Sequence, residues 1–123
     1  MLPKINRLQK NREFERVFKH SRPIQTENFT FRVCTRRSIE LPTRFGYVIS
    51  NKIDKRATRR NALKRQLRQI TQDLILELKS GYDVVVIVKK DFQFPYDQRE
   101  IKEQFLVGLK NQNIFTKSLE TNK

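Results

Sequence analysis

TRRNALKRQLRQITQDLILELKSGYDVVVIV, residues 58–88, holds the two patterns on which the predicted architecture rests. From Thr58, a candidate N-cap, to Lys79, apolar residues recur at helical spacing and form one narrow stripe, which comprises Leu63, Leu67, Ile70, Leu74 and Leu78. Ser80-Gly81 is a helix stop signal, and the β-branched residues that fill 84–88 are typical of a strand covered on both faces. We therefore expect a long amphipathic helix followed by a buried strand.

The residues before position 58 are predicted to form two further strands. Alternation at 29–34 and aromatic and β-branched residues at 45–50 predict two strands, with a connecting loop at 36–43. The strand at 45–50, the long helix and the strand at 82–88 then form a candidate β-α-β unit with a parallel pair.

Two further helices flank this unit. The first has Asn11 as its candidate N-cap and carries an apolar face of Phe14, Val17 and Phe18; the last begins after Asp97. The apolar face of the last helix comprises Ile101, Phe105 and Leu109. We expect one α/β domain over residues 1–123, with a basic N-terminal arm at 1–10 and a frayed tail at 113–123.

The composition points to an anionic partner. The 123 residues include 27 Lys and Arg against 13 Asp and Glu, a formal net charge of +14. The longest apolar run, Val84 to Val88, is far shorter than a membrane span, and no apolar segment follows the basic N-terminus as it would in a secretory signal. We therefore expect a cytoplasmic protein that binds no membrane.

The positive charge is concentrated in two segments. Residues 1–22 hold seven Lys or Arg and two Glu, and residues 52–68 hold eight Lys or Arg and one Asp, whereas residues 69–123 hold eight of each sign. Evenly spread charge would indicate only a solvated surface, but segments of this density are the usual electrostatic footprint of nucleic-acid binding.

The residue types offer little for catalysis by the polypeptide. There is one cysteine, Cys34, and one histidine, His20, so neither a zinc site nor a Ser-His relay can be built from them alone. No phosphate-binding glycine loop is present, and the carboxylates that a metal-dependent nuclease would need fall on expected surface turns and helix ends. Asp73 and Glu77 share a helix face that we expect to be solvated. We predict no catalytic and no metal-binding residues, a surface position for His20, and a structural role for Cys34.

The sequence features that favour RNA binding are stronger than those that favour catalysis. Opposite the leucine stripe, the long helix carries a cationic ridge, which comprises Asn61, Lys64, Arg65, Arg68 and Gln72. Aromatic residues lie near the other cationic segment, and aromatic rings beside cations suit single-stranded RNA. Phe29 and Phe31 alternate with Val33 and are expected in the core, whereas Phe14 and Phe18 fit core packing and base stacking equally well.

Four motifs in order resemble the bacterial ribonuclease P protein component. The cationic helix is similar to that family's R-N-R-x-K-R signature, and the first helix, the strand before the long helix and the buried strand also match. The matching stretches are Arg60 to Arg65, Arg7-Leu8 with Glu13 to Lys19, Arg44 to Lys52, and Gly81 to Val88. The resemblance covers about residues 4 to 112.

The resemblance implies a fold and a division of labour. The fold would be α-β-β-β-α-β-α with a central mixed sheet and a β-α-β crossover, similar to domain 2 of ribosomal protein S5, and would include a further short strand near residues 23–26. The function would be that of an accessory subunit of an endoribonuclease that removes the 5′ leader of precursor tRNA. The RNA subunit would catalyse the cleavage with Mg2+ that it mainly binds itself, and the protein would bind that RNA 1:1, bind the leader and broaden the substrate range.

The resemblance also assigns residues to two RNA contacts. The contact with the catalytic RNA would involve Lys52, Lys55, Arg56, Arg59, Arg60, Asn61, Lys64, Arg65 and Arg68. The contact with the leader would lie in a cleft between the first helix and the sheet and would involve Phe14, Phe18, Arg32 and Ser50.

The sequence departs from the family pattern at informative positions. Ala62 stands where the signature has its second Arg, and Arg32 stands where the family often has an aromatic residue facing the cleft.

Two other functions would also explain the positive charge. A structural RNA-binding protein of the ribosome, with no role in an enzyme, would share the basic helix. An autonomous nuclease would cleave RNA by itself.

Overall fold

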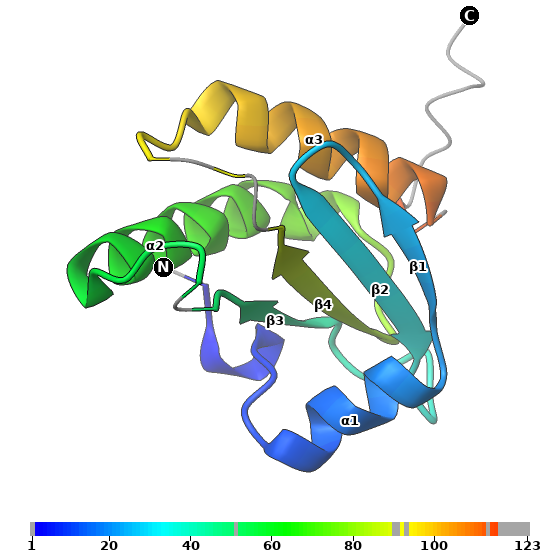
Figure 1. Ribbon diagram of the computed structural model, residues 1–123. Coiled ribbons are helices and arrows are strands. Elements are labelled where there is room, and N and C mark those ends of the chain that lie inside the picture. Colours follow the sequence, from blue (N-terminus) through cyan, green and yellow to red (C-terminus); the bar gives the residue numbers. More distant parts are fainter. Residues whose placement is uncertain (1, 51, 90–91, 93, 113, 116–123) are drawn as a thin grey trace, which may run out of the picture.

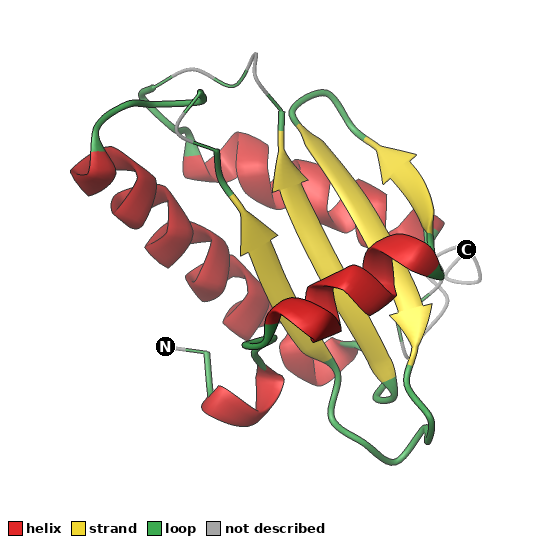
Figure 2. Cartoon of the chain, turned by 60° about the horizontal axis from the view of Figure 1, so that its bottom comes forward, coloured by secondary structure: helices red, strands yellow, loops and turns green. Residues whose placement is uncertain are grey.

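The computed structural model describes residues 2–50, 52–89, 92, 94–112 and 114–115, and within them it contains a four-stranded sheet between two layers of helices (Figure 1). The strands are β1 (Arg22–Gln25), β2 (Phe29–Thr35), β3 (Arg44–Val48) and β4 (Tyr82–Val88). The α-helices are α1 (Asn11–Lys19), α2 (Ala57–Leu74) and α3 (Gln98–Asn111), and short 3-10 turns lie at Lys4–Asn6 and Ile75–Glu77. Helices α2 and α3 cover one face of the sheet, and α1 crosses the other (Figure 2).

The order of the strands confirms the predicted β-α-β unit. The sheet runs β1-β2-β4-β3, with β3 and β4 parallel and the other pairs antiparallel. Strand β4 therefore has a neighbour on each side, and its β-branched run is buried between the helical layers, apart from the half-buried Ile87. Strand β1 is the further short strand that the resemblance implies.

The main core lies between the sheet and helices α2 and α3. The leucine stripe of α2 is buried there as predicted, and Phe29 and Phe31 are fully buried. The ring of Phe105 from α3 packs edge-on against both, at centroid distances of 5.6 and 5.2 Å. A smaller cluster under α1 comprises Leu8, Val17, Cys34 and Val85.

Helix α2 begins and ends earlier than its apolar pattern indicates. Its N-cap is Arg56 rather than Thr58, and the α-helix ends at Leu74 rather than Lys79. After the 3-10 turn, Leu78 is extended and forms a bridge with Phe115, so it reaches the core from outside the helix. Gly81, with a φ of 90°, then turns the chain into β4, a conformation that glycine adopts without strain.

Two other boundaries differ from the prediction. Lys10, not Asn11, precedes the first turn of α1, because the carboxylate of Glu13 accepts the backbone N–H of Lys10. Strand β3 ends at Val48 instead of Ser50, because the carbonyl of Ser50 accepts the N–H of Ile53 and so turns the chain toward α2.

Both ends of the described chain pack against the domain. Leu2 is buried in the main core, and Arg7 forms a bridge with Phe45 of β3. Ile114 and Phe115 are buried in the same cluster, whereas residues 113 and 116–123 of the predicted tail lie outside the described residues. None of the helices in the described part of the chain has the length and hydropathy needed to span a bilayer.

Candidate nucleic-acid interface

Helix α2 presents the cationic ridge along its outer side. The side chains of Asn61 and Arg65 are exposed, and those of Lys64, Arg68 and Gln72 are half-buried beside neighbouring elements. The helix is held to the sheet from beneath, where the hydroxyls of Tyr47 on β3 and Thr71 lie 2.6 Å apart. This attachment fixes the rotation of α2 about its axis and therefore keeps the ridge toward solvent.

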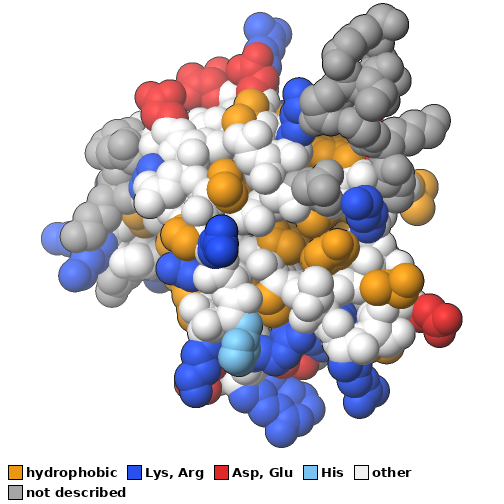
Figure 3. Space-filling model, turned by 90° about the vertical axis from the view of Figure 1, so that its right-hand side faces the viewer, with side chains coloured by type: hydrophobic (Ala, Val, Ile, Leu, Met, Phe, Trp, Pro, Cys, Tyr) orange, Lys and Arg blue, Asp and Glu red, His pale blue; other side chains and the backbone are white. Residues whose placement is uncertain are grey.

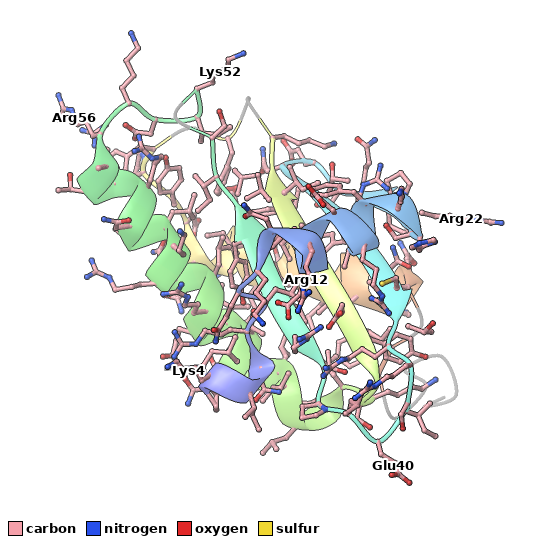
Figure 4. All side chains as sticks on the ribbon, turned by 90° about the horizontal axis from the view of Figure 1, so that it is seen from below. Lys4, Arg12, Arg22, Glu40, Lys52 and Arg56 are labelled. Carbon is pink, nitrogen blue, oxygen red and sulfur yellow. The ribbon has the colours of Figure 1, made fainter. Side chains whose placement is uncertain are left out.

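The remaining predicted cations lie at the N-terminal end of α2. Lys52 and Arg56 extend outward at this end of the molecule (Figure 4), and Lys55 is also exposed. Arg60 donates to the backbone oxygen of Asp54 at 2.8 Å, and the side chain of Arg59 lies 3.7 Å from the Asp54 carboxylate. Asp54 thus fixes two of the predicted cations and leaves the others free to meet an anionic surface.

A hollow of about 210 Å³ lies on one side of the ridge, between α2, β3, α1 and the segment before α1. Its cationic lining comes from Arg7, Lys64 and Arg68, its aromatic lining includes Phe14, and none of its lining residues in the described part of the chain is acidic. Within the described chain, the buried Nε of Arg68 has no hydrogen-bond partner. A buried donor without a partner is costly, so a phosphate oxygen would be favourable here.

The structure divides the residues predicted for the leader cleft. Phe18 is 42% exposed, and the guanidinium of Arg32 lies 5.6 Å from its ring centroid. Arg32 also donates to the carbonyl of Ser21 at 3.3 Å, which holds it beside the end of α1. Phe14 is half-buried with the cluster under α1, and Ser50 lies in the turn that leads toward α2. Phe18 and Arg32 therefore form one contact surface, while Phe14 and Ser50 lie elsewhere.

A buried ionic network near α1 was missed by the sequence reasoning. Asp83 of β4 is fully buried, and Arg44 of β3 donates to both of its carboxylate oxygens at 2.8 Å. Arg16 of α1 lies 3.3 Å from the same carboxylate, and Arg36 lies 3.8 Å from it. The expectation that the acidic residues lie at surface turns and helix ends is wrong for Asp83, because β4 is the central strand.

Glu13 joins α1 to this network. Its carboxylate accepts the backbone N–H groups of Gln9 and Lys10 and lies 2.9 Å from Arg44. Burial raises the pKa of Glu13, but the two backbone hydrogen bonds and the positive charge of Arg44 outweigh burial and leave this pKa below its usual value. The sequence does not predict the ion pair between Arg44 and Asp83, because the pair depends on the parallel register of β3 and β4.

The lone cysteine and histidine lie where the sequence predicts. Cys34 is buried under α1, where burial raises the pKa of its thiol. His20 is exposed at the end of α1, and Figure 3 shows Lys and Arg side chains close to the single histidine. Among the described residues, no three His, Cys, Asp or Glu side chains are grouped to hold a metal ion.

A second hollow, of about 480 Å³, lies on the other side of α2, facing the segment that leads into α3. Arg65 and Phe94 line it. The sequence reasoning did not identify this hollow, because its two sides come from residues about 30 positions apart.

Comparison with known proteins assigns the family. The model of the Ribonuclease P family matches residues 2–112. The ribonuclease P protein component of Rippkaea orientalis is 34% identical over 108 residues, which cover 83% of this chain and 85% of the relative. The ribonuclease P protein component of a Synechocystis strain is 38% identical over 87 residues, which cover 71% of this chain and 69% of the relative.

Solved structures agree with this assignment. The ribonuclease P protein from Thermotoga maritima is 31% identical to this chain and superposes on it with a TM-score of 0.72. The match covers 82% of this chain and 92% of the Thermotoga maritima chain. The Staphylococcus aureus protein has a TM-score of 0.79 over 92% of this chain and the whole of its own, and at 24% identity it supports the fold alone. With a family match across nine-tenths of its length and the same mixed sheet and helices, the chain belongs to the family of bacterial ribonuclease P protein components.

Proposed function

We propose that this chain is the protein subunit of a ribonuclease P that removes the 5′ leader of precursor tRNA. In this role it takes part in an endoribonuclease holoenzyme without supplying the catalytic groups. It binds the catalytic RNA 1:1 through α2, binds the leader beside α1, and so broadens the range of precursors that the RNA can cleave.

The cationic face of α2 is the observation that carries the proposal. Seven Lys or Arg and no acidic residue lie over positions 55–72, in the helix α2 and the two residues before it, and this helix is anchored to the sheet. If about five of these cations contact phosphates, the logarithm of the binding constant falls with the logarithm of salt concentration with a slope of roughly −4. Arginine adds a planar fork that matches phosphate oxygens.

The leader is assigned to the surface made by Phe18 and Arg32. An exposed ring beside a guanidinium can stack on an unpaired base while the cation meets a phosphate, and this combination binds single strands with little sequence preference. Phe14 packs against the cluster under α1 and lines the hollow beside α2 instead.

Mg2+ is assigned to the RNA subunit. Among the described residues, the carboxylates of Asp83 and Glu13 pair with arginines, and no three His, Cys, Asp or Glu side chains are grouped as a two-metal nuclease centre would need. In this proposal the chain binds and orients RNA.

A reconstitution experiment tests the proposal. Precursor-tRNA cleavage by a bacterial ribonuclease P RNA would be measured at low Mg2+ with and without the purified protein, and we expect the protein to raise kcat/KM. The ribosomal alternative predicts no such increase, and an autonomous nuclease predicts cleavage by the protein alone. Unchanged cleavage at every protein concentration would overturn the proposal.

A binding comparison tests the assignment of the leader. The holoenzyme is expected to bind precursor tRNA more tightly than the mature tRNA, which lacks the leader. A structural RNA-binding protein would add the same affinity to both RNAs, because its contacts would be with the phosphate backbone alone.

A further inference from the structure

The hollow on the α3 side of α2 has the features of a site for an unpaired nucleobase. Phe94 is 49% exposed at its rim, and Ala62, Arg65 and Gln66 of α2 form its opposite side. We call it the Phe94 pocket. It lies across α2 from the acid-free hollow that Lys64 and Arg68 line, so RNA lying on the cationic ridge would pass its entrance.

The ring of Phe94 is held in place before any ligand binds. The guanidinium of Arg59 lies 4.0 Å from the ring centroid, and Tyr96 packs edge-on at 5.5 Å. Both supporting side chains are fixed by Asp54, which lies 3.7 Å from Arg59 and accepts the hydroxyl of Tyr96 at 3.3 Å. An exposed aromatic ring supported in this way loses little entropy when a base stacks on it.

The polar groups at the pocket suit the edge of a base. Gln66 donates to the carbonyl of Tyr96 at 3.4 Å, and Gln69 donates to Asp73 at 3.0 Å. Each amide has a further donor hydrogen and a carbonyl oxygen, which can read the donors and acceptors of a base edge. None of the described residues that line the pocket is acidic, and the exposed Arg65 can meet the phosphate of the same nucleotide.

We propose that the Phe94 pocket binds an unpaired nucleobase of the RNA subunit, stacked on Phe94, with Arg65 on its phosphate. The inference rests on the proposed function, because it needs RNA on α2. RNA is the occupant that the charge favours: α2 and the residues just before it carry seven cations and no acid over positions 55–72. Positive charge beside an exposed ring is the combination that binds unpaired bases.

Ala62 keeps the pocket open. Its methyl group is part of the lining, so the longer side chain of an arginine at this position would extend into the space that the base needs. The family signature has an arginine here, whereas this chain has a small residue that lines the pocket. Ala62→Arg would therefore have two opposite effects on RNA binding. Its positive charge would strengthen binding, and its loss of the cavity would weaken it.

The experiment uses tryptophan as a stacking reporter. The chain has no Trp, so Phe94→Trp places a single fluorophore in the pocket and Phe18→Trp places one at the proposed leader surface. Each full-length variant would be titrated with a bacterial ribonuclease P RNA transcript and, as a charge-only probe, with inorganic polyphosphate. Binding would be followed in parallel by a filter assay.

We expect the RNA, but not polyphosphate, to quench the Phe94→Trp variant. Adding Ala62→Arg to that variant should abolish the quenching, whereas Ala57→Arg, which adds the same charge to the same helix outside the pocket, should leave it intact. Phe94→Ala should weaken RNA binding by about fivefold or more, as expected for loss of one stacked base.

Two results overturn the inference in different ways. If RNA binds in the filter assay and the Phe94→Trp fluorescence is unchanged, or if Ala62→Arg tightens binding and keeps the quenching, the pocket holds no base and the proposed function still stands. If the wild-type protein binds no ribonuclease P RNA, the proposed function fails and this inference fails with it.

Discussion

Phe14 and Phe18 have the same spacing on α1 as a pair of core residues, yet only one of them is covered. Phe14 lies over Gly46 of β3, where an added Cβ would come within 2.4 Å of its ring. Phe18, one turn later, is 42% exposed beside Arg32. The glycine makes room for the first ring, and the arginine lies beside the second ring, so the two chemically identical residues have different environments.

At the residue scale, Phe18→Ala should reduce the preference for leader-bearing RNA. Loss of one stacked base predicts that the holoenzyme binds precursor tRNA less tightly by about 1–3 kcal/mol, with little change for mature tRNA. The dissociation constants of both RNAs would be measured at one salt concentration. Val107→Ala, which removes an exposed apolar side chain from α3, is the matched control. An equal loss for both RNAs would contradict the assignment.

Asp83→Asn should be among the most destabilising substitutions in the chain. Neutralising the carboxylate leaves Arg16, Arg36 and Arg44 close together without their common counter-charge, and breaking a buried ion pair costs about 3–5 kcal/mol. Urea unfolding followed by circular dichroism would measure the change in the free energy of unfolding. Asp73→Asn, at an exposed carboxylate on α2, should change it by less than about 0.5 kcal/mol. Similar effects of the two substitutions would exclude a structural role for the network.

At the scale of elements, α1 is attached to the sheet through its first turn. Glu13 receives backbone N–H groups from Gln9 and Lys10 and pairs with Arg44 of β3. The ionised carboxylate of Glu13 therefore fixes the start of α1, while Arg16 and the buried Val17 attach the rest of the helix.

The stability that Glu13 supplies should depend on pH in a defined direction. Because its pKa is lower in the folded protein, the contribution is fully present above the usual value of 4.5 and is lost as the pH falls through the folded value. Comparing the unfolding free energies of wild type and Glu13→Gln should give a difference of about 1 kcal/mol at pH 7 that shrinks below pH 4.5. A difference that is constant from pH 7 to pH 3 would contradict this assignment.

The second element, α2, separates its two tasks by face. The leucine stripe packs into the core, and the cationic ridge stays outside, so substitutions on the ridge can change RNA binding without changing the fold.

Arg65→Ala tests this separation. Removing one phosphate contact should make the slope of log K against log salt concentration less negative by about one unit, with little change in thermal stability. Lys102→Ala on α3 removes the same charge from an exposed helix position away from the ridge, and its slope should match that of the wild type. Identical slopes for all three proteins would show that Arg65 contacts no phosphate.

At the scale of the whole molecule, both ends of the described chain pack into the main core. Leu2 is 1% exposed in the main core, and Ile114 is buried in the same cluster. The segment before α1 therefore has a structural function besides its positive charge: it helps to line the hollow beside α2 and holds Arg7 there through a hydrogen bond of 3.0 Å from Arg7 Nε to the carbonyl of Leu2.

Leu2→Ala should accordingly destabilise the whole domain. Truncating a buried leucine costs about 2–5 kcal/mol, and the loss would appear as a lower midpoint in thermal unfolding. Ile5→Ala is the matched control, because Ile5 is 66% exposed in the same segment and its removal creates no cavity. If the two variants unfold at the same temperature, the side chain of Leu2 does not stabilise the core.

Much of the fold and part of the site could be predicted from the sequence. The leucine stripe, the β-branched strand and the cationic ridge are local patterns, and a helix or strand fixes which of their residues share a face whatever the rest of the chain does. The helix boundaries were less accurate, because Leu78 continues the helical spacing while its backbone pairs with Phe115.

The amino-acid sequence by itself therefore determined the elements, the separation of charge from apolar surface on α2, and the family. The tertiary structure alone decided which distant residues meet: Asp83 with three arginines, Phe14 with Gly46, and Phe94 with Arg59. The physical reason is that these contacts depend on strand order, on register and on the docking of helices. Those features are set by packing between distant segments, and no local periodicity encodes them.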